Sequence, residues 1–161
     1  MTQMKELDQI EDTQKDRYLT FSLGSESYGI EIRYVTEIVG IQMITKVPEL
    51  LDYVKGVINL RGKIVPVMDM RLRFRKEEIT YNERTCIIIV DILDTTIGLI
   101  VDGVSEVITI LEQDIEDKPN MNKTINNQYI NKIGKVGYEV KLLLDCNMLV
   151  DLEELQNITK N

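Results

Sequence analysis

The chain has 161 residues, of which 43% are hydrophobic, so it can bury a core as one domain or as two small intertwined ones. Its 27 acidic and 19 basic residues give a net charge of −8, which argues against nucleic acid as a partner because the phosphate backbone carries the same sign. There is no histidine, which removes the commonest general base and metal ligand together.

The first 15 residues are predicted to form a flexible tail, because they are charged and show no hydrophobic period. They contain no apolar stretch of signal-peptide length, and no later segment reaches the roughly 18 consecutive apolar residues of a membrane span. We therefore expect a cytoplasmic protein that does not insert directly into the membrane.

Strands are expected from residue 18 onward. The segments 18–23 and 28–32 are rich in β-branched and aromatic residues and flank a polar turn, which predicts a hairpin. Residues 33–44 are expected to begin with one helical turn and to continue as a strand. Pro48 and Gly56 stand where a short helix would begin and end, so a helix is predicted between them.

A second hairpin is predicted over residues 54–70, with its turn at Leu60, Arg61 and Gly62. Gly62 can adopt a positive φ at little steric cost, which suits a type I turn with a bulge. Both strands are apolar on both faces, so the hairpin is expected to be covered on both sides. Arg61 is then a lone cation at the hairpin tip, either a solubilising charge or a contact for a partner.

The sequence also repeats itself. Residues 28–39 resemble residues 97–108, with Gly98 lying 69 positions after Gly29. The later parts of the two copies are related by a larger offset, because a polar stretch after residue 110 holds about seven additional residues, where a loop tolerates insertion. Such a repeat predicts a duplicated small domain.

The fold class expected from these patterns is mostly β, with a first barrel at roughly 16–78 and a second at roughly 79–145. Strands exchanged between the two barrels are an open option. Near the end of the chain the apolar residues change to helical spacing, which predicts a C-terminal helix over 147–158.

No catalytic or metal-binding pattern is present in the sequence. Cys86 and Cys146 are not paired in a zinc or redox motif, so they are expected to be reduced, packed thiols. Asp69 and Asp145 end apolar strands at equivalent places in the two copies, and we expect them to cap turns rather than to form a catalytic pair. The composition favours a binding module that uses a groove and free strand edges, with no cofactor and no metal.

The stretch YVKGVINLRGKIVPVMDMRLRF, residues 53–74, closely resembles the signature of the CheW family of bacterial chemotaxis coupling proteins. The resemblance extends over about residues 16–154, with the flanking motifs in the same order. It implies two intertwined five-stranded Src-homology-like β-barrels with short helices. It also implies a non-catalytic adaptor that couples the cytoplasmic tips of methyl-accepting chemoreceptors to the regulatory domain of the histidine kinase CheA, in arrays beneath the membrane.

Carried over position by position, the resemblance implies a receptor-binding set and two kinase-binding regions. The receptor-binding residues are Arg61, Val35, Glu37, Gly56, Ile32, Val101 and Val104, of which Ile32, Val35, Val101 and Val104 would line a groove between the barrels. The kinase would contact the stretches from Arg33 to Gly40 and from Gly134 to Leu142. An exposed ion pair of Arg61 with Glu37 would add only about 0–1 kcal/mol to stability, and weak self-association is allowed. The connector at 71–84 departs from the short glycine-containing loop of the family.

Three other functions stay open at this point. The chain could be an adaptor for a non-chemotaxis histidine kinase, or a double-barrel module that binds a small ligand between its two copies. An enzyme is the third alternative, although neither a histidine nor a nucleophile motif supports it.

Overall fold

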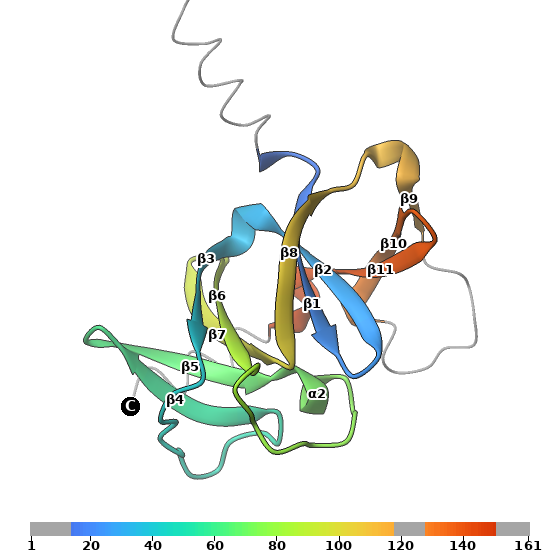
Figure 1. Ribbon diagram of the computed structural model, residues 1–161. Helices are drawn as coiled ribbons and strands as arrows, with labels where there is room; N and C mark the ends of the chain where they lie inside the picture. Colours follow the sequence, from blue (N-terminus) through green and yellow to red (C-terminus); the bar gives the residue numbers. More distant parts are fainter. Residues whose placement is uncertain (1–13, 118–127, 151–161) are drawn as a thin grey trace, which may run out of the picture.

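The computed structural model describes residues 14–117 and 128–150, which form two β-sheets joined by short helices (Figure 1). The predicted mostly β fold class is confirmed, whereas closure of the sheets into barrels stays a prediction. Most of the predicted N-terminal tail lies outside the described residues. The helix predicted over 147–158 does so as well, except for the short helix α3 (Cys146–Leu149).

The first sheet has six strands in the order β8-β1-β2-β11-β10-β9. They are β1 (Arg17–Leu23), β2 (Glu26–Glu31), β8 (Gly103–Thr109), β9 (Ile115–Asp117), β10 (Ile130–Val136) and β11 (Glu139–Leu144). A 3-10 helix, η2 (Glu112–Asp114), precedes β9. Neighbouring strands are antiparallel except β2 and β11, which run parallel.

The second sheet has five strands in the order β3-β6-β7-β5-β4. They are β3 (Val35–Gly40), β4 (Val54–Leu60), β5 (Lys63–Asp69), β6 (Cys86–Ile92) and β7 (Thr95–Val101). The 3-10 helix η1 (Ile32–Tyr34) leads directly into β3, which confirms the prediction of one helical turn followed by a strand. The helix α2 (Met70–Arg73) follows β5, and β5 pairs with β7 in parallel.

Strands of the two sequence copies pair reciprocally. The strand β2 of the first copy lies beside β11 of the second, with Gly29 opposite Leu143. The strand β7 of the second copy lies beside β5 of the first, with Gly98 opposite Val67. In the same way β8 pairs with β1 and β3 pairs with β6. Each sheet therefore contains strands of both copies, while the residue limits of two separate barrels stay a prediction.

A close approach of these parallel strands explains why both copies carry glycine at the crossing. A Cβ atom on Gly29 would lie 2.9 Å from Cδ2 of Leu143. One on Gly98 would lie 2.8 Å from Cγ1 of Val67 and 2.7 Å from Cγ2 of Ile87. Real Cβ atoms do not come this close to other carbon atoms, so a larger residue would push the strands apart.

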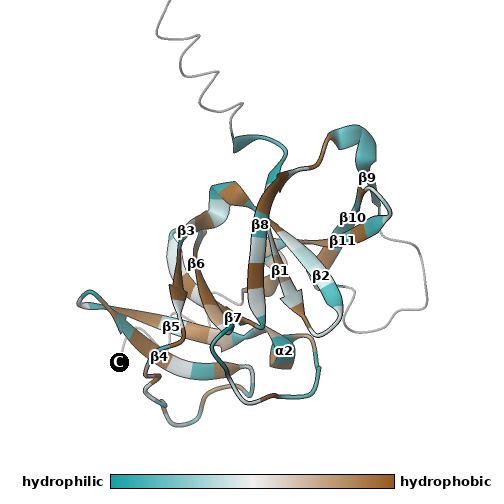
Figure 2. Cartoon of the chain, viewed as in Figure 1, coloured by the Kyte–Doolittle hydropathy of each residue, from teal (hydrophilic) through white to brown (hydrophobic). Residues whose placement is uncertain are grey.

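The core consists of two clusters that use opposite faces of the second sheet. On β6, Ile88 and Val90 belong to the larger cluster, whereas Ile87 and Ile89 belong to the smaller one. Successive side chains of a strand point to opposite faces, so β6 is covered on both sides. Figure 2 shows hydrophobic colouring along β5 and β6 and hydrophilic colouring on the short helix η2 just before β9.

The prediction of a helix between Pro48 and Gly56 is wrong. Residues 48–49 and 52–53 form turns with an irregular stretch between them, and Glu49 has a φ of 64°, which is incompatible with a right-handed helix. The segment is held instead by a backbone bridge in which Thr45 and Val57 exchange two hydrogen bonds of 2.8 and 2.9 Å. A Cβ on Gly56 would lie 2.2 Å from the carbonyl oxygen of Thr45, so glycine is required for this approach.

The predicted capping roles of Asp69 and Asp145 are confirmed. The Asp69 carboxylate accepts hydrogen bonds from the backbone N–H groups of Arg71 and Leu72 at the start of α2, and Asp145 accepts one from Asn147 at the start of α3. The Tyr81 hydroxyl also donates to Asp69, at 2.7 Å, and burial together with this bond raises the pKa of Tyr81. Both carboxylates therefore have structural partners and do not form a catalytic pair.

Candidate partner-binding surface

The tip of the β4–β5 hairpin is a two-residue turn. Leu60 pairs directly with Lys63, which leaves Arg61 and Gly62 as the loop, with φ values of 52° and 88°. Two positive φ values are typical of a type I′ turn, so the predicted type I turn with a bulge is wrong. The Asn59 side chain accepts a 2.7 Å hydrogen bond from the Gly62 N–H and closes the turn.

The turn brings Arg61 into contact with Glu37 of β3. The guanidinium donates to the Glu37 carboxylate at 2.5 Å, and the Arg61 side chain remains 71% exposed. The two residues come from opposite ends of the second sheet, because β3 is one edge strand and the hairpin contains the other. An exposed pair of this kind adds only about 0–1 kcal/mol to folding stability. The pair is therefore of interest as part of a binding surface, because it contributes little to the stability of the fold.

The hairpin is covered at its base but not at its tip. Val65 and Val67 are buried, whereas Ile64, next to the turn, is largely exposed. The expectation that both faces are covered therefore fails near Arg61. An apolar side chain exposed beside a cation is a feature that a partner can use.

The other predicted receptor-binding residues fall into two groups. Ile32 on η1, Val35 on β3 and Val104 on β8 are half-buried, and each packs against the larger core cluster. Val101 is buried within that cluster, and Gly56 lies on β4, where it contacts Thr45. Of the predicted receptor-binding residues, the structure thus brings Arg61 and Glu37 into direct contact, whereas Val101 and Gly56 have structural positions.

Exposed apolar residues recur at equivalent positions of the two copies, and sequence reasoning did not single them out as site residues. Ile38 on β3 is 43% exposed and its equivalent on β8, Val107, is 39% exposed. Ile64 on β5 is 54% exposed and its equivalent on β11, Val140, is 51% exposed. The alignment of the repeats contains all four positions, so the signal was present, but exposure can be read only from the structure. The hairpin from Gly134 to Leu142 adds the fully exposed Tyr138.

Arg73 connects the two copies at their centre. Its guanidinium lies 4.0 Å from the ring centroid of Tyr53 and 4.6 Å from that of Tyr129, two equivalent residues of the repeat. It also donates a 3.0 Å hydrogen bond to the Leu149 carbonyl oxygen. Stacking of an arginine on two aromatic faces stabilises the junction between the halves.

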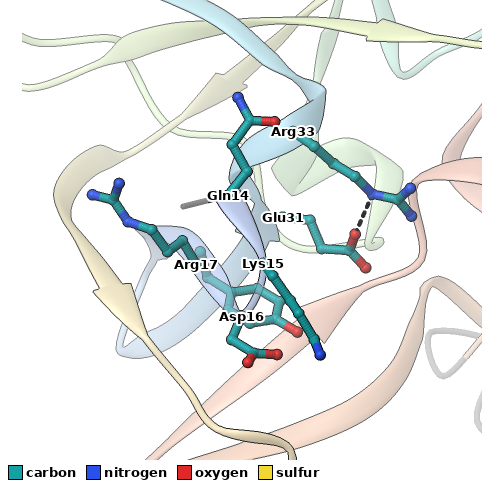
Figure 3. A pocket seen from close by; sticks show the side chains of 7 residues that line it. Gln14, Lys15, Asp16, Arg17, Glu31 and Arg33 are labelled. Carbon is teal, nitrogen blue, oxygen red and sulfur yellow. Dashed lines mark hydrogen bonds and ion pairs between the residues drawn. The ribbon is translucent and has the colours of Figure 1, made fainter. Parts of the chain in front are cut away.

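A charged pocket of about 480 Å³ lies where the described chain begins, and is lined by residues 14–18 together with Glu31 and Arg33 (Figure 3). Glu31 and Arg33 pair with each other at 2.5 Å. Burial and the nearby carboxylates of Glu31 and Asp16 raise the pKa of Tyr18, which moves its titration further from neutral pH. Charges of both signs compensate here, and none of these shifts creates an acid or base suited to catalysis at neutral pH.

Within the described ranges, no three acidic, cysteine or histidine side chains gather in a way that could hold a metal ion. No helix in the same part of the chain is long and apolar enough to cross a membrane.

Comparison with known proteins gives one consistent family. The family model of the CheW-like domain matches residues 17–154. The chain is 35% identical to the chemotaxis protein CheW of Klebsiella aerogenes over 93% of its own length and 92% of that protein. It is 33% identical to the chemotaxis protein CheW of Bacillus subtilis, covering 88% of this chain and 91% of that one.

A solved structure agrees with these relatives. The crystal structure of the scaffolding protein TtCheW from Thermoanaerobacter tengcongensis matches with a TM-score of 0.79 and 37% identity, over 86% of this chain and 94% of that one. The matched family extends from β1 to just beyond α3, and thus over both sheets. The chain therefore belongs to the CheW family, a family of non-catalytic chemotaxis scaffold proteins.

Proposed function

We propose that this chain is an adaptor that couples the cytoplasmic tips of chemoreceptors to the histidine kinase CheA. The proposal depends on the exposed Arg61–Glu37 pair at the hairpin tip, because the arginine of the family signature falls on Arg61. A scaffold acts by presenting surfaces, and the described residues offer exposed apolar side chains next to charges rather than a site for chemistry.

The receptor would contact the surface around Arg61. Glu37 accepts a hydrogen bond from one guanidinium nitrogen of Arg61. The other N–H donors of the guanidinium would suit a partner that offers carboxylate or carbonyl oxygens. Ile64, three residues after Arg61 on the same hairpin, supplies exposed apolar surface. A charge near apolar surface fixes the orientation of a partner more than it adds affinity.

The kinase would contact the stretches from Arg33 to Gly40 and from Gly134 to Leu142. Two observations support this assignment: β3 is an edge strand of its sheet, and the β10–β11 hairpin exposes Tyr138 and Val140. Edge strands and exposed hairpins are the parts of a sheet protein that pair with other chains. Because the two copies present similar faces, one molecule can contact two partners at once, in the cytoplasm beneath a receptor array.

The direct test is the charge reversal Arg61→Glu, with Arg84→Glu as the matched control, since Arg84 is exposed in the connector before β6. We expect both variants to keep the wild-type melting temperature, because an exposed pair contributes little to folding. Only Arg61→Glu should lose binding to receptor-containing membranes, by at least tenfold, together with receptor-dependent CheA autophosphorylation. Unchanged co-sedimentation of receptor and kinase with this variant would refute the assignment.

A charge swap separates a direct contact from an effect on hairpin shape. The double variant Arg61→Glu with Glu37→Arg restores the internal pair with reversed charges. If Arg61 contacts the receptor, the double variant remains inactive. Recovery of coupling to the wild-type level would mean that the pair acts only by holding the hairpin against β3.

A further inference from the structure

The β4–β5 and β10–β11 hairpins are closed at their bases in the same way. At the base of β4–β5, the Asp69 N–H donates a 2.7 Å hydrogen bond to the carbonyl oxygen of Tyr53. At the base of β10–β11, the Asp145 N–H donates one of 2.8 Å to the carbonyl oxygen of Tyr129. Each tyrosine directly precedes the first strand of its hairpin, and a short helix, α2 or α3, follows the second strand. The orientation of each hairpin is therefore tied to the position of one tyrosine.

Arg73 of α2 lies between these two bases. Its guanidinium lies 4.0 Å from the ring centroid of Tyr53 and 4.6 Å from that of Tyr129. It also donates a 3.0 Å hydrogen bond to the carbonyl oxygen of Leu149 in α3. Leu149 is the equivalent of Arg73 in the second copy, 76 positions later, as Asp145 is the equivalent of Asp69. One side chain thus contacts the bases of both hairpins at the point where the two copies meet.

Stability alone does not account for a cation at this position. The Nε atom of Arg73 is buried and, among the described residues, has no hydrogen-bond partner. Removing a cation from water is costly, and an apolar side chain of similar volume often serves a fold equally well. Stacking on two rings offsets part of this cost. An apolar side chain cannot supply the geometry, because a planar guanidinium holds two rings and one carbonyl oxygen in a fixed relation.

Both hairpins depend on their bases for orientation. The parallel ladders that attach them to the sheets lie near those bases, at residues 67–69 of β5 and 142–143 of β11. From there the two hairpins extend toward opposite sides of the view in Figure 1. Near the tip of β4–β5, the exposed Arg61–Glu37 pair contributes little to stability. A strand of seven residues spans about 23 Å, so a rotation of about 10° at a base would move the tip by about 4 Å.

We propose that Arg73 is a positioning residue that fixes the orientation of the β4–β5 hairpin relative to the β10–β11 hairpin. This inference rests on the proposed function, which assigns the two hairpins to a receptor and to the kinase. The contacts of Arg73 lie at the bases of the hairpins, so it acts through Tyr53 and Tyr129 rather than on a partner. It holds the two bound partners at one defined separation, so that a movement of the receptor is passed to the kinase.

Pulsed electron paramagnetic resonance tests the orientation of the hairpins without any partner. Spin labels are attached at Ile64→Cys and Tyr138→Cys, two exposed positions near the hairpin tips, in the full chain with Cys86→Ser. The buried Cys146 stays unlabelled. Adding Arg73→Met should broaden or shift the distribution of distances between the labels by several ångström. The melting temperature should change by less than about 4 °C, because methionine fills a similar volume. An unchanged distribution would overturn the proposal.

Arg75→Met is the matched control, since Arg75 is a neighbouring exposed arginine and its removal changes the net charge equally. It should leave the label distances unchanged. Equal broadening by both variants would overturn the proposal, because the effect would then come from charge. Arg73→Lys covers the case in which methionine unfolds the protein. It keeps the cation but lacks the planar fork, so it should broaden the distribution as well, and a wild-type distribution in this variant would also contradict the proposal.

Receptor-dependent autophosphorylation of CheA tests the functional consequence. Arg73→Met should bind receptor-containing membranes and CheA separately as the wild type does. Activation should fall at least fivefold, the lower end of the roughly 5–150-fold range of coupling between sites. Wild-type activation, or loss of binding to either partner alone, would overturn the positioning role. If Arg61→Glu keeps receptor binding, the proposed function fails, whereas the label distances still decide the role of Arg73.

Discussion

Replacing Gly98 by alanine tests whether the reciprocal pairing of the two copies is as tight as the structure shows. The new Cβ would lie 2.7 Å from Cγ2 of Ile87 and 2.8 Å from Cγ1 of Val67, both on buried side chains. An ordinary contact between such carbon atoms needs about 3.5–4.0 Å, so β7 must shift away from β5 or the neighbours must leave their rotamers. Overpacking of this kind costs about 1–3 kcal/mol.

The expected result is a lower melting temperature for Gly98→Ala, by roughly 2–10 °C for a chain of this length. Gly40→Ala is the matched control, because Gly40 also lies in a strand of the same sheet but a Cβ there meets no atom within 4 Å. Its stability should be unchanged or slightly increased, since alanine restricts the unfolded chain more than glycine does. Thermal unfolding followed by circular dichroism measures both melting temperatures, and urea denaturation gives the corresponding free energies of unfolding.

A double-mutant cycle locates the source of the cost. In a Val67→Ala background one of the two close contacts is removed, so Gly98→Ala should destabilise less than it does in the wild type. Two results would refute the close approach of β5 and β7. One is a Gly98→Ala variant as stable as the wild type, and the other is an equal loss of stability from Gly98→Ala in both backgrounds.

Two further predictions concern titratable groups. The carboxylate of Asp102 loses solvation on burial, but hydrogen bonds from Arg71 (2.8 and 2.6 Å) and from the Gly24 N–H (2.6 Å) outweigh this and lower its pKa. The contribution of Asp102 to stability is therefore complete above its unfolded pKa near 4 and is lost as the pH falls through the lower folded value. Asp102→Asn should reduce stability at pH 7 by about 1–3 kcal/mol and should make stability depend less on pH below pH 4. An equal dependence of stability on acid pH in both proteins would contradict this. Burial, aided by the nearby charges of Glu31 and Asp145, raises the pKa of the Cys146 thiol to about 12. An aromatic disulfide reagent at pH 8 should then react with the half-buried Cys86 in the native protein and with Cys146 only after unfolding; fast reaction of both thiols without denaturant would show that α3 opens readily.

The sequence by itself determined most of the local structure. Alternating and continuous apolar runs placed the strands, and the polar turns placed the first hairpin. The repeat identified Asp69 and Asp145 as equivalent caps, because a carboxylate at a strand end satisfies backbone donors wherever the chain turns. The sequence-based prediction of a helix between Pro48 and Gly56 failed. Residue types typical of helix ends are present there, but backbone hydrogen bonds between Val57 and Thr45 hold the segment in another conformation.

Only the tertiary structure decided which strands are neighbours and which site residues meet. Hydrophobic periodicity reports which face of a strand is buried, but it does not identify the strand on the other side of a hydrogen-bond ladder. For that reason the reciprocal pairing of β2 with β11 and of β7 with β5 could be left only as an option in the sequence. The meeting of Arg61 with Glu37 across the two ends of one sheet likewise depends on how that sheet curves, and the burial of Val101 depends on side chains contributed from both copies.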